Sequence, residues 1–223
     1  MKLITGDFDG TLFEGDSFQL MFKAVTKEFG LREWTTVLGG TVQSIFLGIT
    51  KGKHALRNHF FKAVAKTFRG KTEAELASFF ERLIEEGKDQ INQSLVEKIK
   101  EHQQEGNEVI ILSGALKPFL EALTAELELS VKIIGTELVH DENGTYTGET
   151  GILINGEEKV QAVKKWLENK YSDRELIEIW AYADSESDIP LLDFVDKPII
   201  VNPKEKMREV AEAKQWPIFG ENA

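Results

Sequence analysis

Three short apolar segments, each ending in acidic, hydroxyl or glycine residues, constrain the fold of this chain most strongly. In chain order they read "KLITGDFD", "NEVIILSG" and "LIEIWAYAD". Apolar runs of this length are typical of strands that are buried on both faces of a sheet. Apolar residues with helical spacing lie between these segments, at residues 91–106, 116–127 and 156–170. The alternation of buried strands and helices predicts an α/β fold with a mainly parallel sheet covered on both faces.

The C-terminal half adds shorter elements to this pattern. Residues 131–139 read as one strand, and residues 140–148 carry the Asn-Gly pair that is typical of a β-hairpin turn. Residues 187–202 predict a short helix followed by a strand. Asn202 and Pro203 predict the start of a last helix, because asparagine is a good N-cap and proline suits the first helical position.

Residues 16–88 differ from the rest of the chain because they contain most of its phenylalanine. Three sets of apolar residues recur at helical spacing: Phe18, Phe22, Val25 and Phe29; Phe60, Val64 and Phe68; and Leu76, Phe79, Phe80 and Leu83. This pattern predicts amphipathic helices that bury their own core, with an aromatic-lined substrate pocket as the alternative. We therefore expect an α/β core domain of residues 1–15 and 89–223 and a helical domain of residues 16–88.

The composition of the 223-residue chain argues against several classes of protein. Its net charge of −11 argues against binding to nucleic acid or to an anionic membrane, because phosphate groups are bound by clustered lysine and arginine. The chain has no cysteine, which excludes disulfides, thiolate nucleophiles and cysteine-bound zinc. No apolar run reaches the length of a membrane span, and Asp7 comes too early for a signal peptide. We expect a protein of the cytoplasm.

The ends of the predicted strands carry acids that are suited to a cation. In parallel sheets, ligands bind outside the carboxyl ends of the strands. Asp7 and Asp9 end the first strand two residues apart, a spacing that places both on one face of an extended chain. Asp184 ends another strand, and Asp188 lies four residues later, on the same side of a helical turn. Carboxylates without thiolates favour a hard cation, with Mg²⁺ as the first choice.

A phosphate group fits beside such a cation. Ser113 and the backbone amides of Gly114 and Ala115 offer hydrogen-bond donors at the entrance of a predicted helix. A phosphate and a carboxylate repel each other by about 4 kcal/mol per pair of unit charges at roughly 4 Å, so the site also needs a lysine. Lys159 is the candidate. It lies in the first turn of a predicted helix, where the helix dipole disfavours a cation, and a lysine in such an unfavourable position indicates a functional role. An ordinary surface lysine is the alternative.

These motifs, in their order along the chain, resemble those of the haloacid-dehalogenase superfamily, in its phosphoserine-phosphatase-like branch. "DFDGT" is similar to the first motif, "IILSG" to the second, Lys159 to the third and "YADSESD" to the fourth. The resemblance extends over nearly the whole chain, and residues 16–88 lie where this branch carries its cap. It implies a Rossmann-like core with a mainly parallel sheet, a helical cap inserted after the first strand and a small β-hairpin.

The resemblance also implies a reaction. Asp7 would be the nucleophile that takes the phosphoryl group of a small phosphorylated metabolite and forms an aspartyl-phosphate. Asp9 would be the general acid for the leaving alcohol and then the base that activates water. Dehalogenases of this superfamily lack an acid at the position of Asp9, so its presence favours phosphoryl chemistry.

The binding residues follow from the same resemblance. They are Asp7, the backbone carbonyl of Asp9 and Asp184 for Mg²⁺, and Ser113, Gly114 and Lys159 for the phosphoryl oxygens. Asp188 would be a supporting acid, either as a further metal ligand or as the partner that orients Lys159.

Two positions depart from the pattern of phosphoserine phosphatases proper. Those enzymes carry a glutamate nine residues after the nucleophile, where this chain has the shorter Asp16. They also bind the substrate carboxylate through a cap arginine, and Arg57 lies in the expected region without matching the spacing. The substrate therefore stays open among phosphoserine, an amino-alcohol phosphate such as histidinol phosphate, and other small monoesters.

Three functions are compatible with these residues. The first is a Mg²⁺-dependent phosphomonoesterase, and the second is a phosphotransferase or phosphomutase that passes the aspartyl-phosphate to a sugar. The third is a non-catalytic binding or regulatory protein. The presence of Asp7, Asp9, Ser113 and Asp184 together argues against the third, because a protein without chemistry has no need for a costly cluster of acids.

Overall fold

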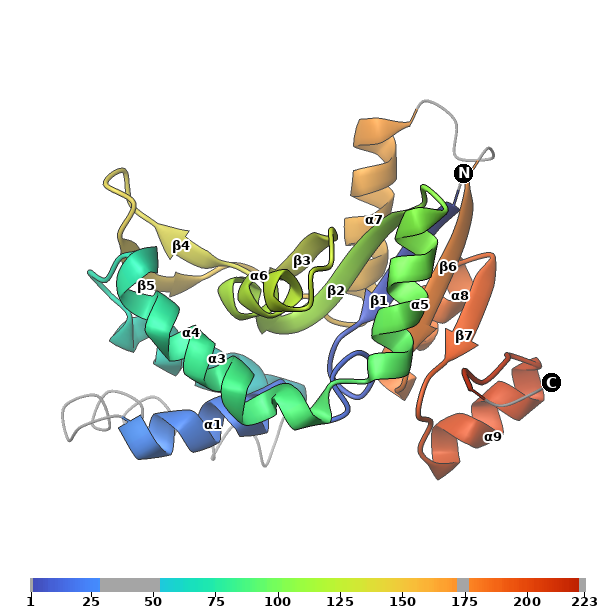
Figure 1. Cartoon of the computed structure of the whole chain (residues 1–223), viewed down its shortest axis with the longest axis horizontal. Coiled ribbons are helices and arrows are strands. Elements are labelled where there is room, and N and C mark those ends of the chain that lie inside the picture. Colours follow the sequence, from blue (N-terminus) through green and yellow to red (C-terminus); the bar gives the residue numbers. More distant parts are fainter. Residues whose placement is uncertain (1, 29–52, 172–176, 221–223) are drawn as a thin grey trace.

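A five-stranded parallel sheet forms the centre of the computed structural model, which describes residues 2–28, 53–171 and 177–220 (Figure 1). Its strands follow the order β3-β2-β1-β6-β7, and each neighbouring pair is parallel. The strands are β1 (Lys2–Asp7), β2 (Glu108–Leu116), β3 (Lys132–Thr136), β6 (Glu178–Ala183) and β7 (Lys197–Ile200). The predicted α/β fold with a mainly parallel sheet is confirmed.

Helices cover both faces of this sheet. Successive residues of a strand point to opposite faces, so neighbouring residues pack against different helices. Ile4 joins an apolar cluster with α5 and α6, whereas its neighbour Leu3 joins a second cluster with α7, α8 and α9. Both residues are at most 1% exposed. The helices are α5 (Gln93–Gln104), α6 (Lys117–Glu126), α7 (Glu157–Lys170), α8 (Ile189–Phe194) and α9 (Glu205–Lys214).

Three further helices and a β-hairpin lie together at one end of the molecule (Figure 1). They are α1 (Ser17–Glu28), α3 (Lys53–Thr67), α4 (Glu73–Gly87), β4 (Leu138–His140) and β5 (Tyr146–Thr150). The hairpin is joined to the helices by backbone hydrogen bonds: Gly70 N–H donates to the Tyr146 carbonyl, and Tyr146 N–H donates to the Lys71 carbonyl, each at 2.8 Å. The apolar cluster that contains Phe8 beside the sheet also contains Phe60 of α3, so helices and sheet share one core.

The chain leaves the sheet region and returns to it at one place. Asn92 N–H donates to the Leu12 carbonyl at 3.0 Å, and Glu14 N–H donates to the Gln90 carbonyl at 2.7 Å. The short 3₁₀ helix η1 (Lys88–Gln90) leads into this crossing. The predicted domain boundaries fall beside these paired segments, and the division into two domains itself stays a prediction.

The prediction of a single strand over residues 131–139 is wrong. Thr136 still pairs with Leu116 in the main sheet, whereas Leu138 pairs with Thr150 in the hairpin. The chain therefore changes its partner at Glu137 and forms β3 and β4 in two different sheets. A run of apolar residues does not reveal such a change, because the pattern of a segment does not show which strand it pairs with.

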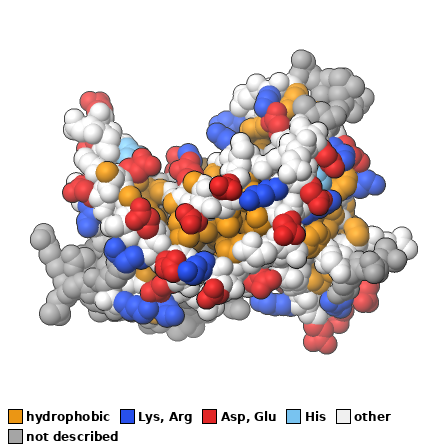
Figure 2. Space-filling view, viewed as in Figure 1, with side chains coloured by type: hydrophobic (Ala, Val, Ile, Leu, Met, Phe, Trp, Pro, Cys, Tyr) orange, Lys and Arg blue, Asp and Glu red, His pale blue; other side chains and the backbone are white. Residues whose placement is uncertain are grey.

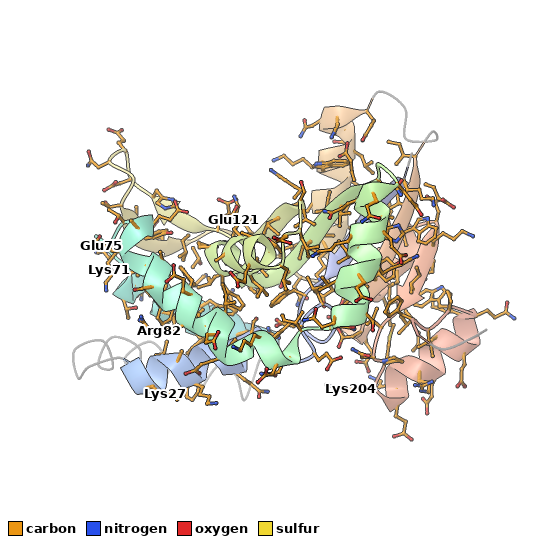
Figure 3. All side chains as sticks on the ribbon, in the orientation of Figure 1. Lys27, Lys71, Glu75, Arg82, Glu121 and Lys204 are labelled. Carbon is orange, nitrogen blue, oxygen red and sulfur yellow. The ribbon has the colours of Figure 1, made fainter. Side chains whose placement is uncertain are left out.

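The predicted start of the last helix is also wrong. α9 begins at Glu205, after Lys204, which is labelled in Figure 3. Asn202 has a φ of 44°, in the left-handed region that asparagine tolerates better than most residues. It therefore forms a bend after β7 instead of a helix cap.

The predicted apolar stripes of the helices are largely buried. Phe60, Phe68 and Phe80 are each at most 4% exposed, but Phe22 is 44% exposed and so does not belong to a closed core. Phe29 lies outside the described residues.

Among the described residues, acidic and basic side chains are interspersed on the face seen in Figure 2. Figure 3 shows Lys27, Lys71, Glu75 and Arg82 on the helical end of the molecule, again with both signs together. Among the described helices, none is long and apolar enough to cross a membrane.

A buried histidine joins α5 to the sheet. His102 is 2% exposed, and its Nε2 lies 2.9 Å from the hydroxyl of Tyr182 in β6. Its ring packs edge-on against Trp180, with 5.4 Å between the ring centroids. Burial, followed by the charge of Lys98, lowers the pKa of His102, and Glu105 opposes the shift. The native state therefore favours the neutral imidazole.

We expect mild acid to destabilise the fold through His102. Because its pKa is lowered in the folded protein, the unfolded chain binds the proton first as pH falls below about 6.5. The free energy of unfolding should then decrease by at most about 1.4 kcal/mol per pH unit. Urea unfolding between about pH 7.5 and 5.5 measures this slope. His102→Gln removes the contribution, so the stability difference between wild type and variant should narrow in acid; a constant difference would contradict the assignment.

Candidate active site

The carboxyl ends of β1, β2 and β6 lie side by side. The β1–β2 register pairs Asp7 with Leu112, directly before Ser113. On the other side of β1, β6 ends at Ala183, directly before Asp184. The polar residues that end these three segments of the sequence therefore meet at one edge of the sheet.

A buried lysine links two acids at this edge. Lys159 Nζ donates to Oδ1 of Asp7 at 2.6 Å and to Oδ1 of Asp188 at 2.5 Å. The three side chains are only 3%, 9% and 1% exposed, in the order Lys159, Asp7 and Asp188. Lys159 lies in the first turn of α7, directly after the turn at Gly156, whose φ is 51°. The surface-lysine alternative is therefore wrong.

Asp184 completes a group of three carboxylates. One carboxylate oxygen from each of Asp7, Asp184 and Asp188 lies within 4.8 Å of the others. Gly10 passes close to this group with a φ of 80°, and a Cβ atom there would lie 2.2 Å from Oδ2 of Asp184. Thr11 Oγ1 lies 3.5 Å from Oδ1 of the same acid. Only glycine fits at position 10, because both the backbone conformation and the space exclude a side chain.

The three carboxylates carry more charge than Lys159 offsets. Burial raises the pKa of Asp7 well above its usual range, although Lys159 opposes the shift. Burial, followed by the negative charge of Asp188, raises the pKa of Asp184 to about 6. Burial alone would lower the pKa of Lys159, but the two carboxylates beside it outweigh this effect and raise it. One ammonium among three carboxylates leaves an excess of negative charge that suits a divalent cation with oxygen ligands.

Asp9 has different partners from Asp7. The backbone N–H of Ser17 donates to Oδ1 of Asp9 at 2.6 Å, and the Ser17 hydroxyl donates to Oδ2 at 2.9 Å. Arg57 of α3 donates from Nη2 to the same Oδ2 at 2.5 Å. Burial raises the pKa of Asp9, and Arg57 and Ser17 oppose the shift. β1 ends at Asp7, so Asp9 does not lie on the same extended strand. The prediction that strand spacing places Asp7 and Asp9 on one face is therefore wrong.

The two predicted substrate residues lie beside Asp9. Nη2 of Arg57 is 3.5 Å from Oδ1 of Asp16, so one guanidinium contacts two acids. Asp16 Oδ1 also accepts a hydrogen bond from Phe18 N–H at 2.9 Å, in the first turn of α1. Asp16 therefore caps a helix in addition to facing Arg57.

Ser113 and Gly114 lie within β2, which continues to Leu116. The predicted helix entrance at these residues is therefore wrong, because α6 begins only at Lys117. Ser113 is 1% exposed, and its hydroxyl accepts a hydrogen bond from Ala115 N–H at 3.0 Å. Because this hydroxyl accepts that bond, its own hydrogen can be donated to a ligand. A Cβ atom on Gly114 would lie 3.4 Å from the carbonyl oxygen of Ile154, so the loop before α7 passes close to Gly114.

The sequence patterns do not predict three contacts of the site. Gly10, Thr11 and Ser17 each approach an acid of the site, but small residues carry no chemical signature of their own. Gly10 and Thr11 could have been found because they directly follow Asp9 in "DFDGT". Ser17 precedes a helical pattern, which on its own indicates a helix start.

A family model described as haloacid dehalogenase-like hydrolase matches residues 4–193. The chain belongs to this family. Among curated relatives of this hydrolase family, the histidinol-phosphatase of Neisseria meningitidis serogroup C (strain 8013) is 30% identical over 123 residues. That region is 54% of this chain and 55% of the relative. The chain spans about half the length of the first curated relatives that it matches.

Two solved structures show the same fold. A protein with unknown function from Bordetella pertussis Tohama I has a TM-score of 0.78 and 23% sequence identity, with 97% of each chain covered. A substrate-bound phosphoserine phosphatase complex has a TM-score of 0.61 and 18% identity, with 99% of this chain and 93% of that chain covered. The resemblance in fold to phosphoserine phosphatases is confirmed.

We expect the loss of Lys159 to destabilise the folded protein strongly. Lys159→Met leaves the buried carboxylates of Asp7 and Asp188 without their cation, and breaking a buried pair in this way costs about 3–5 kcal/mol. Urea unfolding in metal-free buffer at neutral pH measures the loss. Lys165→Met, at an exposed position of the same helix, is the matched control and should change stability by less than about 0.5 kcal/mol. Equal stability of the two variants would contradict this account of Lys159.

Proposed function

We propose that the protein is a Mg²⁺-dependent phosphomonoesterase that hydrolyses a small phosphorylated metabolite through an aspartyl-phosphate intermediate. The buried hydrogen bond between Lys159 and Asp7 is the observation that carries this proposal. An attacking carboxylate and a phosphate ester repel each other, so a carboxylate nucleophile needs fixed positive charge beside it. An ammonium 2.6 Å from Asp7 supports that role.

The proposed reaction has two steps. An oxygen of Asp7 attacks phosphorus, and the bond from phosphorus to the ester oxygen breaks; that oxygen keeps the electron pair and takes a proton from Asp9. The alcohol then leaves. Water attacks the phosphorus of the aspartyl-phosphate and gives a proton to Asp9, and the bond from phosphorus to Asp7 breaks. The sum is ester plus water to alcohol plus inorganic phosphate, with both acids restored.

The acid group fits Mg²⁺ in the chemistry of its donors. We infer that Asp7, the backbone carbonyl of Asp9 and Asp184 would hold the ion, because these oxygens are the ligands that Mg²⁺ prefers. The bond from Lys159 to Asp188 favours the second of the two roles predicted for Asp188, that of orienting the lysine. When bound, Mg²⁺ supplies positive charge that offsets the charge on the phosphoryl group.

We infer that Ser113, Gly114 and Lys159 hold the oxygens of the transferring phosphoryl group. The register of β1 and β2 supports this, since it pairs Asp7 with Leu112, the residue directly before Ser113. The Ser113 hydroxyl and the backbone N–H of Gly114 would donate to the phosphoryl oxygens, and Lys159 would offset their charge.

We infer that Arg57 and Asp16 contact the part of the substrate beyond the ester oxygen. Their position beside Asp9, which serves the leaving group, supports this role. A guanidinium and a carboxylate together suit a metabolite with an amino group, such as an amino-acid or amino-alcohol phosphate. The names of the histidinol-phosphatase relative and of the phosphoserine phosphatase neighbour support the same class of substrate.

We infer that residues 16–88 act as a cap over this site and that the protein works in the cytoplasm. The paired crossing at residues 12–14 and 90–92 supports the cap, because a segment that enters and leaves at one place can move as a unit. The location in the cytoplasm stays a prediction from composition.

We expect Asp7→Asn to lose at least about a thousandfold in phosphate release, because an amide is not a nucleophile. The assay uses the purified full chain, Mg²⁺, and a panel of amino-acid, amino-alcohol, sugar and nucleotide monophosphates. Asp193→Asn, at an exposed acid of α8 that pairs with Lys214, is the matched control and should keep the activity. Phosphate release by Asp7→Asn at the wild-type rate would contradict the proposal. Sugar isomers with little free phosphate would favour the phosphotransferase alternative.

We expect Mg²⁺ to stabilise the folded protein at the acid group. At about 100 times its dissociation constant, a ligand of the folded state adds about 2.7 kcal/mol to the free energy of unfolding. Urea unfolding with Mg²⁺ and with EDTA measures the gain. Asp184→Asn removes one proposed ligand and should lose most of it, whereas Glu186→Gln, at an exposed acid two residues later, should keep it. The same gain in both variants would rule out Asp184 as a ligand.

A further inference from the structure

Ser17 binds both carboxylate oxygens of Asp9 from the first turn of α1. Its backbone N–H donates to Oδ1 at 2.6 Å and its hydroxyl donates to Oδ2 at 2.9 Å. Ser17 is 3% exposed, so little water reaches these two bonds. A carboxyl group that is held in this way cannot rotate about its Cβ–Cγ bond without breaking both hydrogen bonds.

We propose that Ser17 is a positioning residue for Asp9: its hydroxyl holds the carboxyl group in the orientation that meets the ester oxygen of the substrate. This inference rests on the proposed function, in which Asp9 gives its proton to the leaving group. Ser17 itself makes no contact with the substrate in this account and acts only through Asp9.

The neighbouring arginine explains why the hydroxyl matters. Nη2 of Arg57 donates to the same Oδ2 that accepts the Ser17 hydroxyl, and it also lies 3.5 Å from Asp16. Without the hydroxyl, Oδ2 is held by Arg57 alone. Arginine is long and has many rotamers, so the bond from the backbone N–H of residue 17 to Oδ1, which remains, no longer suffices to fix the rotation of the carboxyl group. Proton transfer depends on that orientation, because the donor has to lie within hydrogen-bond reach of the ester oxygen.

A purely structural role for Ser17 makes a different prediction. The first N–H groups of a helix have no acceptor within the helix, so Asp9 stabilises α1 by accepting from Ser17 N–H. Helix capping accounts for the N–H bond but not for a hydroxyl that donates to the other oxygen of the same acid. If Ser17 only stabilised α1, its loss would slow the reaction equally for every substrate.

The test compares two leaving groups. An alkyl phosphate needs a proton on its leaving oxygen, whereas p-nitrophenyl phosphate releases a stable anion and needs little help from an acid. The value of kcat/KM reports the step that forms the aspartyl-phosphate. We expect Ser17→Ala to lower kcat/KM by about 10- to 100-fold for the alkyl phosphate and by much less for p-nitrophenyl phosphate. Ser17→Thr keeps the hydroxyl and should restore most of the loss.

Two further variants make the outcome decisive. Thr124→Val removes another buried hydroxyl, which donates to the Leu120 carbonyl in α6, and should leave both rates unchanged. In an Asp9→Asn background, Ser17→Ala should have no further effect on the alkyl phosphate. An equal loss on both substrates, or an undiminished loss in the Asp9→Asn background, would overturn the role of Ser17 alone. An Asp9→Asn protein with the full wild-type rate on the alkyl phosphate would instead overturn the proposed role of Asp9, and with it this inference.

Discussion

The buried ammonium of Lys159 between Asp7 and Asp188 is the interaction on which the rest of the site depends. It joins the end of β1, the first turn of α7 and the 3₁₀ turn η3 (Glu186–Asp188). Asp7 and Asp188 lie 152 and 29 residues from Lys159 along the chain. A buried charge without a partner is costly, so these three elements hold one another in place. With Asp184 in the group, the same arrangement keeps an excess of negative charge at the edge of the sheet. That excess is the physical reason to expect a divalent cation there.

The two acids of "DFDGT" belong to different parts of the molecule. Asp7 ends the central strand and bonds to Lys159 of the sheet region, whereas Asp9 bonds to Ser17 of α1 and Arg57 of α3. Among the described residues, all hydrogen-bond partners of the Asp9 carboxylate therefore come from the helical end of the molecule. A shift of those helices would change the hydrogen bonds of Asp9 and leave those of Asp7 in place. The fold thus separates the acid proposed for attack from the acid proposed for proton transfer.

The sheet was predictable because its signals are local. The runs at β1, β2 and β6 are apolar on both faces, and each leads into a polar residue, namely Asp7, Ser113 and Asp184. The strand break at Glu137 and the bend at Asn202 were not predictable, because they depend on which partner the chain meets next. Hydrophobic period and capping preference describe a segment by itself and carry no information about that partner.

The sequence by itself determined that Asp7, Ser113 and Asp184 meet, because the carboxyl ends of parallel strands share one edge of a sheet. It also placed Lys159 in the first turn of a helix. Only the tertiary structure decided that Lys159 is buried against Asp7 and Asp188, and that Asp9 is held by Ser17 and Arg57. These contacts depend on where the loops and helices lie relative to the sheet. The spacing of residues along the chain does not show those positions. Gly10 also depends on the tertiary structure, because the fold brings Asp184 so close that a side chain at position 10 would collide with it.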